Sequence, residues 1–318
     1  MHPPEKEKPI HHKNTRRKFG HDYRSPWKYH ITITKAPSCE PFSSLEVKEL
    51  TINGVSTKNT LLGQIIWRAI RDMQQSSIKI YQYAIMPDHI HMLIHVTDRL
   101  MDHLGDYIAR FKAGITSEWQ RRKNNPKLAI FCENYNDRII LPEHSLDEVY
   151  QYIRQNPYRL AVRKASPDFF RRQRYIFVNN REIQAYGNLF LLRNPFKISL
   201  VIHRADTEEI FNKKMEECLY YATNGGVVVS PFISPREKHI RKEIEAVGGR
   251  IILIHSRPFP DRHKPARHNF NQCSSGNLLL ISPIDYLSLP VTDHPSYSQC
   301  HDMNDLAALI ANPESKIT

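Results

Sequence analysis

The chain has 318 residues, a formal net charge of +12 at pH 7 and a sequence pI near 9.4. This length suits one large domain or two ordinary ones. It contains no run approaching the ~20 apolar residues of a membrane-spanning helix, and its charged N-terminus lacks the apolar core of a signal peptide. We therefore expect a cytoplasmic protein with no membrane contact. The excess of positive charge favours a polyanionic partner such as nucleic acid.

The first half of the chain alternates between strand and helix patterns. Residues 1–20 are basic and proline-containing, which predicts a flexible arm. The expected elements that follow are strand 29–36, helix 60–74, strand 77–86, strand 89–96, helix 103–122, strand 133–141 and helix 145–164, the last opening with a capping box from Ser145 to Glu148. This order predicts an α+β, ferredoxin-like domain over residues 21–180, with an antiparallel sheet and helices on one face.

The second half has a different pattern. After a connector at 181–195, four apolar strands at 197–204, 226–232, 250–256 and 277–283 alternate with helical segments. This alternation predicts an α/β, Rossmann-like domain with a parallel sheet over residues 196–290, followed by a C-terminal tail at 291–318. The helix after Ser234 opens with a capping box to Glu237, and such a strand-to-helix junction can hold an anion. No glycine-rich phosphate-binding motif is present, so support for a nucleotide cofactor is weak.

The five cysteines are scattered, and no two of them form a C-x-x-C pair. A disulfide framework or a cysteine-ligated zinc site is therefore not expected. We expect free thiols.

Two histidines interrupt an apolar strand in "YQYAIMPDHIHMLIHV", residues 81–96. His89 and His91 are two residues apart, so both project from one face of the strand. They could face the core, form a surface patch or bind a metal, and a metal site needs a third ligand. On the helix at 145–164, Tyr152 and Asn156 share a face, and the Asn156 amide oxygen suits a hard divalent cation. Tyr152 could equally be a packing residue.

These two motifs together resemble a known family. "MPDHIHMLI" followed by "YIRQNPYRLAV" is similar to the REP-associated and insertion-sequence-type tyrosine transposases, which are single-tyrosine members of the HUH endonuclease superfamily. The resemblance covers about residues 25–165. The C-terminal half weakly resembles the Rossmann-like domain of the DNA-processing (Smf) proteins. DNA binding, a small-ligand site and oligomerisation all remain open for that half.

The resemblance implies a chemistry for each matched residue. His89, His91 and Asn156 would bind Mg²⁺ or Mn²⁺, and Tyr152 would be the nucleophile that forms a 5′-phosphotyrosine intermediate. The implied partner is single-stranded DNA with a hairpin, a REP-like palindrome, bound by a monomer or a homodimer associated with the nucleoid. Two alternatives stay open. One is a non-catalytic, domesticated protein that binds repeated hairpins, and the other is an unrelated hydrolase in which the histidines activate water through a metal.

Basic residues gather in three segments, 11–18, 119–127 and 163–177, and the third interleaves them with aromatic residues. Cations along a backbone and rings that stack on bases are what single-stranded nucleic acid requires. A solvated charged face is the alternative. The predicted DNA-binding residues are Arg16, Arg17, Lys18, Arg110, Lys112, Arg121, Arg122, Lys123, Arg171, Arg172 and Arg174.

Overall fold

The computed structural model describes residues 18, 20–141, 146–260, 263–265, 267–288, 294–312 and 314–318. The chain divides into two compact units, Met1–Ala161 and Val162–Thr318. This boundary precedes the expected one at residue 180, because residues 172–187 form a hairpin that joins the sheet of the second unit. Arg16 and Arg17 lie outside the described residues, as does nearly all of the predicted arm.

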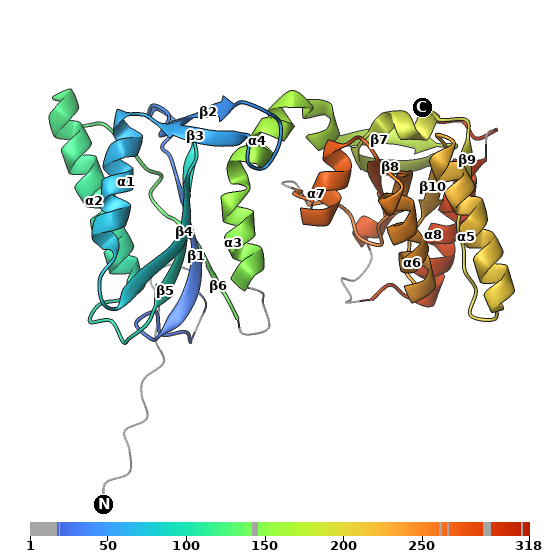
Figure 1. Cartoon of the computed structure of the whole chain (residues 1–318), viewed down its shortest axis with the longest axis horizontal. Helices are drawn as coiled ribbons and strands as arrows, with labels where there is room; N and C mark the ends of the chain where they lie inside the picture. Colours follow the sequence, from blue (N-terminus) through green and yellow to red (C-terminus); the bar gives the residue numbers. More distant parts are fainter. Residues whose placement is uncertain are drawn as a thin grey trace, which may run out of the picture. The chain divides into compact units, whose positions relative to one another are not determined.

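The first unit is built on a four-stranded antiparallel sheet in the order β4-β5-β1-β6 (Figure 1). Its strands are β1 (Trp27–Thr34), β4 (Ile78–Ile85), β5 (His89–Val96) and β6 (Asn136–Ile139). β1 lies between β5 and β6 and pairs with both, so β4 and β6 are the edge strands.

Helices cover both faces of this sheet, whereas the sequence led us to expect helices on one face only. α1 (Leu61–Met73) and α2 (Leu104–Lys123) pack on one face, and α3 (Leu146–Arg154) packs against β4 and β5 on the other (Figure 1). The cause is that β5 is apolar on both sides. Ile90, Met92 and Ile94 belong to the larger core, while Leu93 packs with the buried residues of α3.

The helix predicted over 145–164 is two helices. α3 ends at Arg154, and α4 (Asn156–Ala165) begins after a single turn residue, Gln155. Pro157 explains the break, because it has no N–H to donate to the carbonyl of Ile153 and its ring crowds the preceding turn. The predicted capping residue Ser145 lies outside the described residues.

A hairpin that the sequence patterns do not predict precedes α1. It consists of β2 (Ser43–Val47) and β3 (Val55–Asn59), paired with each other in a separate two-stranded sheet. α1 approaches the chain at the base of this hairpin so closely that a Cβ on Gly63 would lie 2.0 Å from the carbonyl oxygen of Phe42. Only glycine fits there.

The second unit holds a six-stranded sheet in the order β7-β8-β12-β11-β10-β9. β9 to β12 run parallel, as the strand–helix alternation predicts, and β8 adds an antiparallel strand next to β12. The strands are β7 (Arg172–Val178), β8 (Arg181–Gly187), β9 (Lys197–Ser199), β10 (Val227–Ser230), β11 (Arg250–Ile254) and β12 (Leu278–Pro283).

Helices also cover both faces of this second sheet. α5 (Glu208–Thr223), α6 (Pro235–Ala246) and α7 (Arg267–Ser274) share one core, and α8 (Tyr297–Ala311) belongs to the core on the opposite face. Two predictions need correction here. The expected connector 181–195 instead forms β8 and a short 3-10 helix, Leu189–Arg193, and the expected tail carries α8, whose apolar residues are buried because they complete a core.

The described residues include no helix long and apolar enough to cross a membrane. All five cysteines are free thiols.

Candidate active site

The candidate site lies on the neighbouring strands β1 and β5, which pair with each other. The register sets Thr32 opposite His91 and Thr34 opposite His89, so the even-numbered side chains of β1 share a face with the odd-numbered side chains of β5. This face is the one that α3 covers. The two predicted histidines therefore lie beside polar residues of the neighbouring strand, His30 among them.

The two imidazoles of the H-x-H motif face each other. The Nε2 atoms of His89 and His91 are 3.0 Å apart, and the ring centroids are separated by 4.6 Å. His89 is half-buried and His91 is buried.

Each imidazole is held through its other nitrogen. Nδ1 of His89 donates to the Asp88 carboxylate at 2.7 Å, which leaves the lone pair of a neutral ring on Nε2. Nδ1 of His91 lies 3.0 Å from Nε2 of His30 and 3.0 Å from Oγ1 of Thr32. Contacts of this kind orient histidines that bind metals, because they fix the ring and the tautomer.

His30 is neutral at physiological pH. Burial lowers its pKa to about 4, and the nearby charges of Arg138 and His89 act in the same direction. The neutral His30 ring can donate or accept the hydrogen bond between its Nε2 and Nδ1 of His91, and it adds no positive charge to this buried place.

Tyr152 reaches this cluster from the helix above the sheet. Its ring lies edge-on to His91, with centroids 5.7 Å apart, and edge-on to His30 at 5.9 Å. The buried side chains Val149 and Ile153 anchor α3 against the sheet, which fixes the face that Tyr152 presents. The structure thus brings the predicted nucleophile and the predicted histidines together.

Asn156 is buried at the start of α4. Its side-chain amide nitrogen donates to the backbone carbonyl of Tyr152 at 2.8 Å, across the break between the two helices. This hydrogen bond ties Asn156 to Tyr152 rather than to an imidazole. The guanidinium of Arg159, also buried, lies 5.5 Å from the centroid of the Tyr152 ring.

The paired Nε2 atoms suit one side of an octahedral cation. Two neighbouring ligands at about 2.1 Å from such a cation are about 3 Å apart, which is the separation found here. Among the described residues, no group of three or more histidine, cysteine, aspartate or glutamate side chains is arranged to hold a metal ion. Further ligands would have to be of another kind, such as an amide, a phosphate oxygen or water.

Asp88, His30 and Thr32 are the site residues that sequence reasoning missed. In the sequence, Asp88 follows Pro87 and looks like an ordinary turn residue. The signal for the other two is the polar alternation in "YHITIT" of β1, but it becomes meaningful only once the register with β5 is known.

The predicted cations of α2 differ in their surroundings. Lys112 is half-buried, and its ammonium donates to the carbonyls of Cys132 and Glu133 at 2.7 Å each; burial lowers its pKa. Arg121 is exposed. The other three form ion pairs, which are Arg110–Asp102 at 2.8 Å, Arg122–Glu118 at 2.8 Å and Lys123–Glu40 at 3.1 Å.

The remaining predicted cations are split between the two units. Lys18 is exposed in the first unit. Arg171, Arg172 and Arg174 belong to the second unit, where Arg172 donates to the carbonyl of Phe259 at 2.9 Å and the other two are exposed. The basic and aromatic segment 163–177 therefore belongs entirely to the second unit, whereas Tyr152 belongs to the first.

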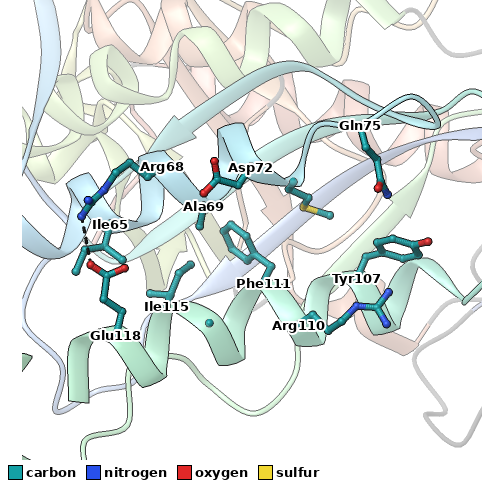
Figure 2. A pocket seen from close by; sticks show the side chains of 12 residues that line it. Ile65, Arg68, Ala69, Asp72, Gln75, Tyr107, Arg110, Phe111, Ile115 and Glu118 are labelled. Carbon is teal, nitrogen blue, oxygen red and sulfur yellow. Dashed lines mark hydrogen bonds and ion pairs between the residues drawn. The ribbon is translucent and has the colours of Figure 1, made fainter. Parts of the chain in front are cut away.

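A cleft of about 680 Å³ lies between α1 and α2, on the face of the sheet away from Tyr152 (Figure 2). Its apolar floor includes Ile65, Phe111 and Ile115. Its rim carries both signs of charge, and Arg68 pairs with Glu118 across it at 3.3 Å. The charges on this rim balance within the cleft, so it offers little attraction to a polyanion.

The strand-to-helix junction at β10 and α6 is already filled by a carboxylate. Glu237 is buried, and its Oε2 accepts the N–H groups of Ile233 and Ser234 at 2.8 Å each, while Oε1 accepts that of Ile202 at 3.3 Å. The capping box is present as predicted. However, the N–H groups that could have held an anion are occupied by the chain's own side chain.

Comparison with known proteins finds distant relationships. No family model matches this chain. An uncharacterized protein of Haemophilus influenzae is 29% identical over 172 residues, which cover 46% of this chain and 89% of that protein. Among solved structures, a REP-associated tyrosine transposase bound to a REP hairpin is similar with a TM-score of 0.31 and 14% identity, over 49% of this chain and 75% of that one.

Proposed function

We propose that the first unit is a metal-dependent endonuclease or transposase of the HUH type, which cleaves and rejoins single-stranded DNA near hairpins. The observation that carries the proposal is the convergence of Tyr152 on the histidine pair, with 5.7 Å between the ring centroids of Tyr152 and His91. A phenol, two facing imidazoles and a buried guanidinium in one place form a site suited to phosphoryl transfer.

In this proposal His89 and His91 hold Mg²⁺ or Mn²⁺ through their Nε2 atoms, and the Asn156 side chain supplies a further ligand. Such a cation polarises a phosphate oxygen and offsets the negative charge that develops in the transition state. Asp88 orients His89 through the 2.7 Å hydrogen bond, and His30 and Thr32 orient His91.

The chain's own nucleophile is the phenolic oxygen of Tyr152. It attacks the phosphorus of a phosphodiester, the bond from phosphorus to O3′ breaks, and a bond from the tyrosine oxygen to the 5′-phosphate forms. The phenol loses a proton and the departing 3′ oxygen gains one, so the step is balanced without water. Because the ester bond is conserved, attack by another 3′-OH rejoins DNA without a nucleotide energy source. Arg159 places a positive charge beside the reacting groups.

The proposed partner is a single strand with a REP-like palindromic hairpin, and the +12 charge supports a polyanionic partner. The protein would act at the nucleoid as a monomer or a homodimer.

Tyr152→Phe tests the proposal against its alternatives. The full-length chain is incubated with Mn²⁺ and a library of hairpin-containing single strands, and covalent adducts are detected on denaturing gels. We expect the wild type to form an adduct and Tyr152→Phe to form none, while single-strand binding stays within about twofold. Tyr150→Phe, on the same helix, is the matched control and should keep the adduct.

Three results would contradict the proposal. Adduct formation by Tyr152→Phe would exclude this nucleophile. Cleavage without any adduct would favour a hydrolase that activates water. Binding without cleavage by the wild type would favour the non-catalytic hairpin binder.

A further inference from the structure

A second cleft of the first unit lies next to the helix break that follows Tyr152. It has a volume of about 490 Å³ and lies between β3, the edge strand β4 and the junction of α3 with α4. β4 and β3 belong to different sheets and do not pair, so the edge of β4 borders this space. Figure 1 shows the hairpin of β2 and β3 beside α4.

The hairpin is tethered on both sides of the cleft. The hydroxyl of Ser43 donates to the carbonyl of Ile85 at 2.8 Å, which joins β2 to the end of β4. The guanidinium of Arg154 donates to the side-chain oxygen of Asn53 at 3.2 Å, which joins the hairpin loop to α3. The two links hold the walls in place, so the cleft is a preformed feature of the unit.

The lining of this cleft has hydrogen-bonding groups but little charge. Among the described residues, it contains three carboxamides, Asn53, Asn59 and Gln82, and one charged side chain, Arg154. A carboxamide both donates and accepts, which matches the edges of nucleobases. In contrast to the cleft between α1 and α2, the lining residues that the structure describes include no carboxylate to repel a phosphate backbone.

Two aromatic rings complete the lining. Trp67 is half-buried and donates from Nε1 to the hydroxyl of Tyr83 at 3.0 Å, and Tyr83 is 36% exposed on the edge strand. Exposed rings beside polar groups are the usual platform for stacking an unpaired base. The hydrogen bond between Trp67 and Tyr83 holds both rings in one arrangement.

The cleft also has a fixed relation to the nucleophile. Ile153 and Arg154 directly follow Tyr152 in the chain, Pro157 directly follows Asn156, and all three line the cleft. One side of the α3–α4 junction therefore presents Tyr152 to the histidines, while another borders the cleft. A nucleotide bound in the cleft would therefore be close, along the DNA strand, to the phosphate that Tyr152 attacks in the proposed reaction.

We propose that this cleft binds an unpaired nucleobase of the cleaved strand and so selects the position of cleavage. The inference rests on the proposed function, and it adds a specificity site formed by Asn59, Trp67, Gln82 and Tyr83. Base identity is read by the carboxamides, and the rings supply stacking.

Photocrosslinking tests where the base lies, and it needs no cleavage. Single strands carrying 5-iododeoxyuridine at one position at a time beside a hairpin are bound to the Tyr152→Phe chain, irradiated and mapped by mass spectrometry. We expect one or two positions to crosslink to Trp67 or Tyr83. Crosslinks confined to other regions, such as the cleft between α1 and α2, would overturn the inference.

Substitution tests the selection itself. We expect Gln82→Ala and Trp67→Ala to reduce the ratio of dissociation constants between non-preferred and preferred flanking bases by about tenfold. Gln75→Ala, in the cleft between α1 and α2, is the control and should leave this ratio unchanged. Thermal unfolding identifies any variant that fails to fold. In that case Asn59→Ala, which changes another carboxamide of the lining, provides a second test of the same ratio.

The two proposals fail in different ways. Adduct formation through Tyr152 with an unchanged base ratio in every cleft variant would overturn the cleft and leave the nuclease standing. Loss of base preference in the cleft variants, together with a wild-type chain that never forms an adduct, would support base binding in the cleft and overturn the nuclease. A chain that binds no single strand would overturn both proposals.

Discussion

Among single residues, Asp88 has the clearest effect on the histidine pair. Its carboxylate accepts a hydrogen bond from Nδ1–H of His89, which leaves the lone pair on Nε2, the atom nearest His91. Without Asp88, the His89 ring can rotate and can place its proton on either nitrogen. The proposed metal site would then lose part of its preorganisation.

We expect Asp88→Ala to weaken Mn²⁺ binding by about 10- to 100-fold, the usual effect of removing a group that orients a histidine ligand. Titration of the full-length chain followed by electron paramagnetic resonance of free Mn²⁺ measures this directly and is independent of cleavage. Asp72→Ala, an exposed change on α1, is the control. Equal Mn²⁺ affinities for Asp88→Ala and the wild type would show that Asp88 does not act on a metal site.

Single residues also show what the sequence could reveal about the site. The candidates His89, His91 and Tyr152, which the fold brings together, could be selected because their spacing along one strand and one helix is visible in the chain. His30 and Thr32 were not found, because their relevance depends on the register of β1 against β5, and cross-strand register is a property of the folded sheet.

Among elements, those with a clear apolar pattern were predicted well, and those without one were not. α1 buries Ile65, Ile66 and Ile70 at helical spacing, and the prediction of a helix over 60–74 agrees with the observed Leu61–Met73. The hairpin of β2 and β3 was missed because most of its side chains are exposed or half-buried, so it lacks an alternating pattern. The helix break before Pro157 can be predicted from the sequence, because proline disrupts a helix interior.

Two glycines in the helices of the first unit should respond oppositely to alanine. The methyl group of Gly63→Ala would meet the Phe42 carbonyl, which is backbone and cannot turn aside, so we expect a loss of about 3 kcal/mol in the free energy of unfolding. Gly114, in the middle of α2, faces open space, and Gly114→Ala should add about 0.5–1 kcal/mol.

Urea unfolding followed by tryptophan fluorescence measures both effects. Trp27, Trp67 and Trp119 are the chain's three tryptophans, and all lie in the first unit. Equal midpoints for the two alanine variants would show that α1 can move away from the hairpin.

For the whole molecule, acid should weaken both units, because each holds a buried histidine whose pKa is lowered to about 4, His30 in the first and His255 in the second. His255 follows β11 in the second unit, and its Nε2 is shielded from solvent with no hydrogen-bond partner in the described structure. Burial lowers its pKa to about 4, and the charges of His263 and Arg241 act in the same direction. The unfolded chain, with an ordinary histidine pKa near 6.5, binds more protons between these two values.

Stability of the second unit is therefore complete above about pH 6.5 and falls as the pH drops toward 4. At pH 5 the expected loss from His255 is about 2 kcal/mol. Far-UV circular dichroism in urea at pH 7.5 and pH 5 should show this loss, and His255→Gln should remove most of it. Tryptophan fluorescence in the same samples reports the first unit and should not respond to the substitution. An identical pH dependence in wild type and variant would contradict the assignment to His255.

Glu237 fills the anion position of the β10–α6 junction with a group of the chain itself. Because this carboxylate is covalently part of α6, it occupies the N–H groups of Ile233 and Ser234 whatever the cellular concentration of phosphate compounds. The loop after β10 is consequently tied to the first turn of α6 without help from a bound ligand.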